Sequence, residues 1–438
     1  MWWLPFLLIY IIQIIRLSRL KRSKMAKIRP FEAIRPRAEL VGHVAALPYD
    51  VYDNAEARVQ TQKEPLSFLA IDRPETQFEP DCDMYADRIY TKAHDLLWEQ
   101  IRQGIFVRDQ SKCYYIYEQS INERSQTGIV GCAAIDDYIS GVIKKHENTR
   151  QEKEQDRIRH VDACNAQTGP IFLCYRDRQE IDACVERIKK SQEPIYNFTS
   201  VDQVHNRVWK VSAEQDILFL QNAFEQIGEI YIADGHHRCS SAVKVGLKRR
   251  QEDPMPTGGK EYDFFLSVLF PDNQLMIMDY NRVVRDLNGM DTETFLQKID
   301  GNFQISKPQA NVMVPAVKGQ FGLYLENKWY LLEAKKEICS EDAVEGLDVS
   351  ILQKNILEPV LGINDPRTDK RIDFVGGIRG TDELERRCRE DMKLAFAMHP
   401  TSIQELFCVA DADRLMPPKS TWFEPKLLSG LFIHDIMN

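Results

Sequence analysis

The sequence lacks several signatures that would assign a function directly. It contains no Walker A glycine-rich loop ending in Lys-Ser/Thr and no protein-kinase motif set. It also has no internal repeat and no low-complexity linker. Positive charge is not in excess, because 57 Lys and Arg residues face 66 Asp and Glu residues, for a formal net charge of −9. This balance argues against a general nucleic-acid-binding protein, whose surface would be basic.

Cysteine occurs ten times, but never in the arrangements that bind zinc or mark redox sites. The sequence contains no C-x-x-C pair and no paired Cys and His spacing typical of zinc. Scattered thiols are typical of a reducing compartment, where disulfides are rare. We therefore expect no disulfide bond and a cytoplasmic location.

Long hydrophobic runs are scarce, and the longest lies at the N-terminus. Residues 1–15 are apolar and residues 16–24 are basic. The run is shorter than the ~20 residues of a membrane span, and its charges lie on the wrong side for a signal peptide. An over-extended start codon, a marginal membrane anchor and a disordered tail remain as interpretations. We expect residues 1–24 to lie outside the fold, which would begin at Met25, and we do not expect membrane binding.

The rest of the chain reads as a globular protein with alternating helix and strand patterns. Its 438 residues, 43% of them hydrophobic, suffice for one large domain or two ordinary ones. Hydrophobic periodicity predicts a helix over 83–104 and strands over 66–72, 113–121, 125–135, 263–271 and 274–284. The last two strands are expected to pair around Asp272-Asn273. A boundary after residue 287 would separate a catalytic domain, 25–287, from a C-terminal α+β region, 288–438.

The most distinctive stretch is YIADGHHRCSSA, residues 231–242. A buried-strand pattern stops at an Asp-Gly pair, and two histidines and an arginine follow at once. Glycine lets a ligand approach the backbone closely, and helix N-terminal N–H groups attract anions. The arginine can fork onto phosphate oxygens, and the aspartate can hold Mg²⁺. The alternative is an Asp-Gly turn with two surface histidines. The predicted phosphate or nucleotide site comprises Asp234, Gly235, His236, His237 and Arg238.

A second candidate region is the charged stretch KKHENTRQEKEQDRIRH, residues 144–160. His146 and Glu147 lie where an apolar segment ends, and a carboxylate at such a boundary can act as a general base. Helical spacing would place four polar side chains on one face, namely Thr149, Lys153, Asp156 and His160. The alternative is an exposed helix laced with salt bridges. We predict His146 and Glu147 as catalytic residues and Arg157 as a phosphate-binding residue.

Two polar, rigid stretches near the C-terminus form a third candidate region. They are NDPRTDKRIDFVGG, residues 364–377, and MPPKSTWFEPK, residues 416–426. Each reads as a loop that carries Arg or Lys and can clamp a phosphate or close over a site. An ordered surface loop with internal salt bridges is the alternative. We predict Arg367 and Lys419 as phosphate-binding residues.

Together these stretches resemble the DUF1015 family, along nearly the whole chain from Met25 onward. RPFEAIRP and AALPYDV near the N-terminus carry the resemblance, as do the stretches at 144–173, 231–238, 365–377 and 416–434. The family is similar to ParB-like and sulfiredoxin-type nucleotide-binding domains, whose activity-bearing relatives include free serine kinases. The resemblance implies an α+β fold: a ParB/sulfiredoxin-like nucleotide-binding core with a C-terminal α+β extension.

The same resemblance implies roles for the candidate residues. Glu147 would be the base, and Asp234, His236, His237 and Arg238 would bind phosphate and metal. Many relatives continue the histidine motif with Tyr, whereas this chain has Cys239, which we expect to pack inward.

The leading hypothesis is an ATP- and Mg²⁺-dependent kinase that converts free L-serine to O-phosphoserine. Phosphoryl transfer needs positioning, charge neutralisation and a base, and the candidate residues supply all three. A ParB-like nucleotide switch or DNA-partitioning adaptor is one alternative, although the acidic balance and the lack of a helix-turn-helix signal count against it. A metal-dependent phosphohydrolase or nuclease, with His146, His236 and His237 around a metal, is another. Nucleic acid is not an expected partner, and the oligomeric state stays open.

Overall fold

The computed structural model describes residues 25–149 and 151–437, and these form two compact units. The first unit contains 25–144, Thr149–Gln274 and 425–437. The second contains Lys145–Asn148 and Leu275–Glu424. This division differs from the predicted boundary after residue 287, because the long segment of the second unit begins at Leu275. Residues 425–437, predicted to lie in the C-terminal region, belong to the first unit. The predictions for residues 1–24 fall outside the described residues.

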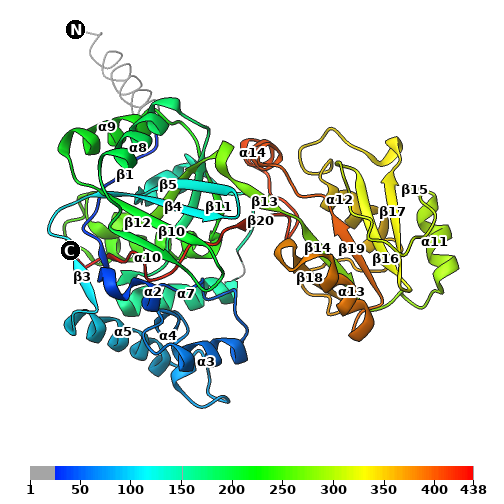
Figure 1. Cartoon of the computed structure of the whole chain (residues 1–438), viewed down its shortest axis with the longest axis horizontal. Coiled ribbons are helices and arrows are strands. Elements are labelled where there is room, and N and C mark those ends of the chain that lie inside the picture. The colour runs from blue at the N-terminus through cyan, green and yellow to red at the C-terminus, as the bar shows by residue number, and fades with distance from the viewer. Residues whose placement is uncertain (1–24, 150, 438) are drawn as a thin grey trace, which may run out of the picture. The chain divides into compact units, whose positions relative to one another are not determined.

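The first unit is built on a nine-stranded mixed sheet in the order β6-β11-β8-β12-β5-β4-β10-β9, with β1 beside β5 (Figure 1). The pairs β11–β6 and β12–β8 are parallel, and the other pairs are antiparallel. The strands are β1 Ile28–Arg29, β4 Tyr114–Ile121, β5 Arg124–Ala134, β6 Ile143–Lys144, β8 Ile171–Tyr175, β9 Tyr196–Thr199, β10 His205–Val211, β11 Ile230–Asp234 and β12 Phe264–Pro271. β11 therefore lies one strand from the edge of the sheet.

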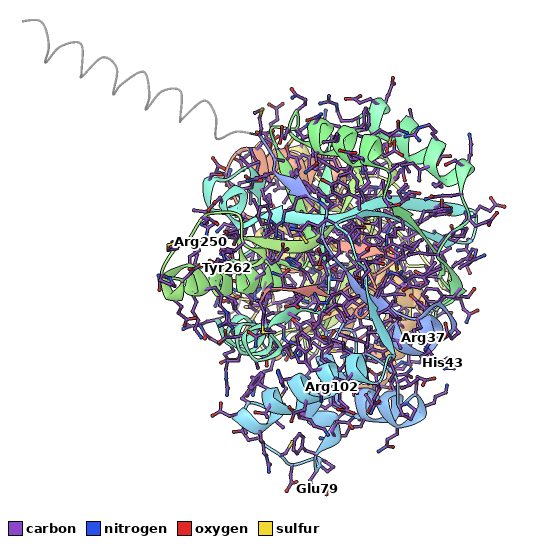
Figure 2. The ribbon with its side chains drawn as sticks, turned by 90° about the vertical axis from the view of Figure 1, so that its left-hand side faces the viewer. Arg37, His43, Glu79, Arg102, Arg250 and Tyr262 are labelled. Carbon is purple, nitrogen blue, oxygen red and sulfur yellow. The ribbon has the colours of Figure 1, made fainter. Side chains whose placement is uncertain are left out.

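Helices cover this sheet on both faces, with α8 and α9 on one side and α7 and α10 on the other (Figure 1). The amphipathic pattern of α5 buries Ile89, Ala93 and Leu97, as the sequence predicts. At the far end of α10, Arg250 pairs with Asp136, close to Tyr262 on the surface (Figure 2). The helices are α2 Val41–Val44, α3 Asn54–Lys63, α4 Leu69–Asp72, α5 Asp87–Arg102, α6 Ile135–Ser140, α7 Gln151–Cys164, α8 Gln179–Ser191, α9 Glu214–Phe224 and α10 His236–Glu252.

The C-terminal segment 425–437 runs through the first unit. Its strand β21 (His434–Asp435) pairs with β7 (Ala166–Gln167), and Ile433 bridges to Ile34 of β2 (Ile34–Pro36), which itself pairs with β3 (Phe106–Arg108). Leu431 and Phe432 are fully buried. Gly430 packs so tightly that a Cβ there would lie 2.3 Å from Phe68. The segment is thus part of the core of the first unit.

The second unit is an antiparallel six-stranded sheet in the order β15-β17-β16-β19-β14-β18. The hairpin between β16 and β17 turns at Glu326 and Asn327, both with positive φ, as a two-residue primed turn requires. The sheet strands are β14 Tyr280–Val284, β15 Phe303–Ile305, β16 Gln320–Leu325, β17 Lys328–Ala334, β18 Ile372–Gly376 and β19 Leu394–Met398. A separate pair joins β13 Met276–Met278 to β20 Trp422–Glu424. The helices are α11 Thr292–Asp300, α12 Asp348–Leu352, α13 Gly380–Glu390 and α14 Ile403–Asp411.

The structure confirms the mixed α and β composition and corrects three local predictions. The expected strand 66–72 is wrong, because Leu69–Asp72 forms helix α4, whose residues are all buried. A short, fully apolar run has no period that separates strand from helix. The expected pairing of 263–271 with 274–284 is also wrong, since β12 pairs with β5 and β8, and the later stretch breaks at Asp279 into β13 and β14.

The third correction concerns α7. Thr149 precedes the helix, and Lys153 is exposed. The buried face instead carries Glu154, Arg157, His160 and Cys164. The ParB- and sulfiredoxin-like assignment of the core stays a prediction. Over the described residues, no helix is long and apolar enough to cross a membrane, and all ten cysteines are free.

Candidate functional site

The Asp-Gly-His-His-Arg motif lies at the junction between β11 and α10. The strand ends at Asp234, and the helix begins at His236, so the two histidines and Arg238 occupy its first turn. Gly235 joins the two elements at φ +90°, a conformation that favours glycine. A Cβ at Gly235 would lie only 3.1 Å from Arg238 Nε. Glycine here therefore permits both the sharp turn and the position of the guanidinium.

The first turn of α10 has an unusual charge distribution. It contains no acidic residue, although acidic side chains stabilise a helix N-terminus and cations do not. Arg238 Nη1 donates to the carbonyl of Pro170 at 2.7 Å. His236 is buried and His237 is half-buried. A basic group beside the N–H groups of a helix N-terminus favours an anion at this place.

Asp234 is held by a residue from the C-terminal segment. Its Oδ2 accepts from Lys426 Nζ at 3.0 Å, and its Oδ1 accepts from the backbone N–H of Gly235 at 2.7 Å. Burial raises the pKa of this carboxyl, but Lys426, Arg238 and the Gly235 N–H outweigh it and hold the pKa well below its usual range. Asp234 is therefore ionised at neutral pH, the form in which it can bind a cation.

Helix α10 packs on α7, and this contact places Arg157 beside Arg238. Ser240 and Ser241 of α10 donate to the side chain and the backbone carbonyl of Glu154, at 3.0 and 3.1 Å. Arg157 and Arg238 line one narrow pocket of about 30 Å³, room for a water-sized group. The other polar lining residues are Tyr49, Asp72, His160, Gln167 and Thr168.

Arg157 is buried but fully compensated by its surroundings. Its Nη2 lies 2.8 Å from Asp156 Oδ2, and its guanidinium stacks over the Tyr49 ring with Cζ 4.2 Å from the centroid. Burial would lower the pKa of Arg157, but Asp156, Tyr49 and Asp72 outweigh it and raise that pKa. Burial and Arg157 together lower the pKa of His160, so this imidazole is neutral at pH 7. Its Nε2 lies 2.9 Å from the carbonyl of Ile71.

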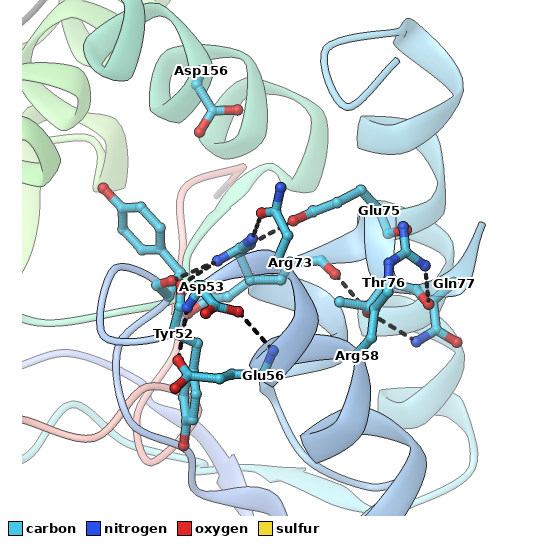
Figure 3. A network of polar contacts seen from close by, with 12 residues as sticks. Tyr52, Asp53, Glu56, Arg58, Arg73, Glu75, Thr76, Gln77 and Asp156 are labelled. Atoms are coloured by element: carbon cyan, nitrogen blue, oxygen red, sulfur yellow. Dashed lines mark hydrogen bonds and ion pairs between the residues drawn. The ribbon is translucent and has the colours of Figure 1, made fainter. Parts of the chain in front are cut away.

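A buried arginine holds the loop that carries Tyr49. Arg73 Nη1 donates to the carbonyls of Tyr49 and Tyr52, each at 3.0 Å, and Nη2 donates to Asn54 (Figure 3). Arg73 Nε pairs with Glu75 at 2.5 Å. The part of the pocket wall that Tyr49 forms is thereby held by a network of polar contacts.

The other predicted site residues belong to the second unit. The carbonyl of His146 accepts from the backbone N–H of Met416 at 2.8 Å, and its Nε2 lies 3.5 Å from Thr421 Oγ1. Glu147 lies in the same short segment, Lys145–Asn148. Arg367 pairs with Asp365 at 2.8 Å, and Lys419 adopts a left-handed backbone with φ +60°. Arg367 lines a second pocket, and the residues just before Lys419 line it too, so the two predicted loops converge.

Several residues of the first-unit site escaped the sequence analysis. Lys426 lies within the MPPKSTWFEPK motif, but only the structure pairs it with Asp234. Tyr49 follows the leucine-proline pair of AALPYDV. Asp72 and Thr168, whose side chains hydrogen-bond at 2.9 Å, were not among the predicted site residues. Cys239, by contrast, is fully buried, which confirms the prediction that it packs inward.

The donor set fits Mg²⁺ only through Asp234. Within residues 25–149 and 151–437, no group of three or more His, Cys, Asp and Glu side chains is arranged to hold a metal ion. Mg²⁺ in nucleotide-dependent enzymes is usually bound by one or two carboxylates together with substrate phosphates. One ionised carboxylate, now paired with Lys426, is compatible with that mode.

Comparison with solved structures gives remote similarities. A free serine kinase mutant in complex with ADP is 13% identical, with a TM-score of 0.32, over 69% of this chain and 89% of that chain. The C-terminally truncated SbnI from Staphylococcus aureus is 11% identical, with a TM-score of 0.36, over 68% and 85%. A conserved hypothetical protein from Pyrococcus furiosus is 13% identical, with a TM-score of 0.32, over 69% and 94%. Similarities this remote assign no activity to the chain.

Sequence comparison gives a clear result at the level of the family. No curated protein matches the chain. The model of the family described as "Protein of unknown function (DUF1015)" matches residues 28–350, about three quarters of the chain. The chain therefore belongs to the DUF1015 family.

Proposed function

We propose that this protein is a nucleotide-dependent phosphotransferase, with the phosphates bound at the first turn of α10. The observation that carries the proposal is the basic first turn of α10, where Arg238 and two histidines follow Gly235. A helix N-terminus that holds a cation and no acid is stabilised when an anion binds there. The adjoining pocket is too narrow for a nucleotide. The base and ribose would therefore lie outside it.

The residues at and beside this turn would have different roles in binding the nucleotide phosphates and Mg²⁺. Arg238 would fork onto phosphate oxygens, with His236 and His237 as further donors. Arg157 would contribute positive charge from the adjoining pocket. Asp234 would hold Mg²⁺ together with the nucleotide phosphates, after release from Lys426. Bound Mg²⁺ supplies neutralisation of the phosphate charge.

We propose free L-serine as the acceptor and ATP as the donor, following the family resemblance. The bond between the γ-phosphorus of ATP and its bridging oxygen breaks, and a bond forms to serine Oγ. The products are ADP and O-phosphoserine. The hydroxyl proton passes to a carboxylate, because a serine hydroxyl is a poor nucleophile at neutral pH. Glu147, beside His146, is the proposed base on the sequence alone. Arg367 and Lys419 remain candidate phosphate ligands on the same basis.

Incubation of the full chain with ATP, Mg²⁺ and free L-serine tests the proposal, with O-phosphoserine read by mass spectrometry. Glu147→Gln keeps the shape of the side chain and removes the base. We expect it to lower kcat by roughly 10²–10⁴ with nucleotide affinity nearly unchanged. Arg238→Ala should lower nucleotide affinity about tenfold or more, because a charge-assisted fork is lost. Lys248→Ala, an exposed cation on the same helix, is the matched control and should change neither quantity.

Three outcomes would redirect the proposal. If no O-phosphoserine forms with ATP, ADP or CTP, the serine kinase assignment is wrong. Hydrolysis of ATP without any acceptor would favour the phosphohydrolase alternative. Retention of DNA at low salt without phosphoryl transfer would favour the ParB-like adaptor.

A further inference from the structure

The second unit buries a cation that its own fold does not neutralise. Arg282 lies on β14, between β18 and β19, opposite Phe374 and Phe396. Its exposed fraction is 4%. Its Nη1 donates to the carbonyl of Tyr280, and its Nη2 donates to the carbonyl of Lys419 at 3.0 Å. Both partners are neutral backbone groups.

No carboxylate of residues 25–149 or 151–437 forms an ion pair that offsets this charge. Among the ion pairs of the described residues, none involves Arg282. Burial lowers the pKa of Arg282 to about 10, against a small opposing influence of Tyr280. The guanidinium is thus still charged at neutral pH. Because an isolated buried cation is unfavourable, such a group calls for an anion from outside the chain.

Arg282 opens onto a pocket large enough for a small molecule. The pocket has a volume of about 560 Å³, within the usual range of ligand pockets. Its apolar wall includes Val344, Val349, Leu357, Phe374 and Met416. The other charged pair in the lining cancels, since Arg367 binds Asp365. Arg282 is therefore the uncancelled charge among the described lining residues.

Beside the pocket, Lys419 has a left-handed backbone conformation, and Arg282 hydrogen-bonds to its carbonyl. Lys419, whose carbonyl accepts from Arg282, has a φ of +60°. Ser420 Oγ donates to the carbonyl of Pro417 at 2.6 Å and closes the same turn. Non-glycine residues in this conformation cluster at binding sites. The two carbonyl bonds use two of the five N–H donors of the guanidinium, so donors remain for a ligand.

We propose that this pocket binds a small organic anion, with its anionic oxygens on Arg282 and its apolar part against Phe374 and Met416. Carboxylates and phosphate monoesters share this chemistry, since both match the planar fork of arginine. Every lining residue belongs to the second unit. The inference thus rests on Arg282, whereas the phosphate site of the proposed kinase rests on Arg238 of α10.

Isothermal titration of the full chain with six-carbon probes tests the proposal. The probes are hexanoate, monohexyl phosphate and the uncharged 1-hexanol. We expect hexanoate or monohexyl phosphate to bind saturably and at least tenfold more tightly than 1-hexanol, and their ranking identifies the anionic group. Equal affinity for 1-hexanol, or no saturable binding of either anion at millimolar concentration, would overturn the proposal.

Variants assign the binding to Arg282. Arg282→Gln should lower the affinity for the tighter-binding anion at least tenfold. Arg282→Lys should retain part of that affinity, because lysine keeps the positive charge. Arg285→Gln removes an exposed cation three residues along the chain and should leave affinity unchanged, as should Arg238→Ala. Unchanged affinity in Arg282→Gln would contradict the assignment, and so would a loss in Arg238→Ala.

Hydrogen exchange on the wild-type chain provides a test without any substitution at Arg282. The better anion should slow exchange in peptides covering 364–367 and 415–420, where the pocket wall is formed. Peptides covering 230–240 should be unaffected. Protection of 230–240 instead would move the anion to α10 and refute the second-unit site.

Discussion

Two buried arginines, Arg157 in the first unit and Arg282 in the second, lie in opposite electrostatic surroundings. Arg157 of the first unit is paired with Asp156 and stacked on Tyr49, and its pKa is raised. Arg282 of the second unit meets only carbonyls and a ring, and burial lowers its pKa to about 10. A buried charge that is paired within the protein can be accommodated by the fold alone. A buried charge without a counter-charge is instead stabilised by binding an anionic ligand. The comparison therefore separates an arginine whose charge is largely balanced by groups of the same unit from one whose charge is not.

The largest expected effect on stability comes from removing the acidic partner of Arg157, which leaves it buried without a counter-charge, as Arg282 is. Asp156→Asn removes the carboxylate that balances Arg157, both side chains being about nine-tenths buried. Because breaking a buried pair leaves a desolvated charge, we expect the free energy of unfolding to fall by about 3–5 kcal/mol. Urea denaturation measures it. Asp87→Asn breaks the exposed pair with Arg159 and should cost less than about 1 kcal/mol. Equal costs would mean that Arg157 does not depend on its partner.

The second prediction extends the comparison to buried acids. Burial raises the pKa of Asp348, in the second unit, to about 7. In the first unit, Glu261 has its pKa lowered to about 2, because His434, Lys112 and Arg29 outweigh burial. A carboxyl whose pKa is raised in the folded state favours folding fully at pH values below its pKa in the unfolded chain, near 4. That contribution to stability is lost as the pH rises through the folded-state pKa of about 7. A carboxyl whose pKa is lowered in the folded state favours folding fully above about pH 4. That contribution to stability is lost as the pH falls towards 2.

We therefore expect the second unit to lose roughly 2–4 kcal/mol between pH 4 and pH 7 through Asp348. The first unit should instead weaken below pH 4. Hydrogen exchange followed separately in β16–β17 and β4–β5 peptides distinguishes the two units. Asp348→Asn should flatten the pH dependence of the β16–β17 peptides. Persistence of the full slope in that variant would assign the titration to another group.

The smallest effect concerns Arg238, whose position depends on a glycine. Gly235→Ala forces a side chain into φ +90° and to 3.1 Å from Arg238 Nε. Gly141, at φ +79°, has nothing within 4 Å of such a Cβ. Gly141→Ala should cost about 1 kcal/mol through conformation alone, and Gly235→Ala about 2 kcal/mol. Thermal denaturation measures both. Nucleotide affinity should fall in Gly235→Ala and stay unchanged in Gly141→Ala. If both variants lost the same stability and the same nucleotide affinity, Gly235→Ala would not act through Arg238.

Sequence patterns located the strand-to-helix junction at Asp234 because an apolar run stops there at an Asp-Gly pair. Arg157 and Arg238 were predicted to bind phosphate from two separate stretches, and the structure brings both to one pocket. Long-range contacts left no such trace. Nothing in the neighbours of Lys426 indicates that it meets Asp234, 192 residues earlier. Helix α4 was missed because its four residues are all buried and have no solvent face. Arg282 was missed because the letters NRVV reveal neither burial nor the absence of a carboxylate.

The path of the C-terminal segment through the first unit has a consequence for biosynthesis. Strand β7 is translated early, but its partner β21 leaves the ribosome only after the whole of Leu275–Glu424. The second unit can therefore begin to fold while the first still lacks β21 and the lysine that pairs with Asp234. Closing a contact across such a long stretch of chain is slow. On a translating ribosome, the proposed nucleotide-binding turn is thus completed only after the second unit has been synthesised.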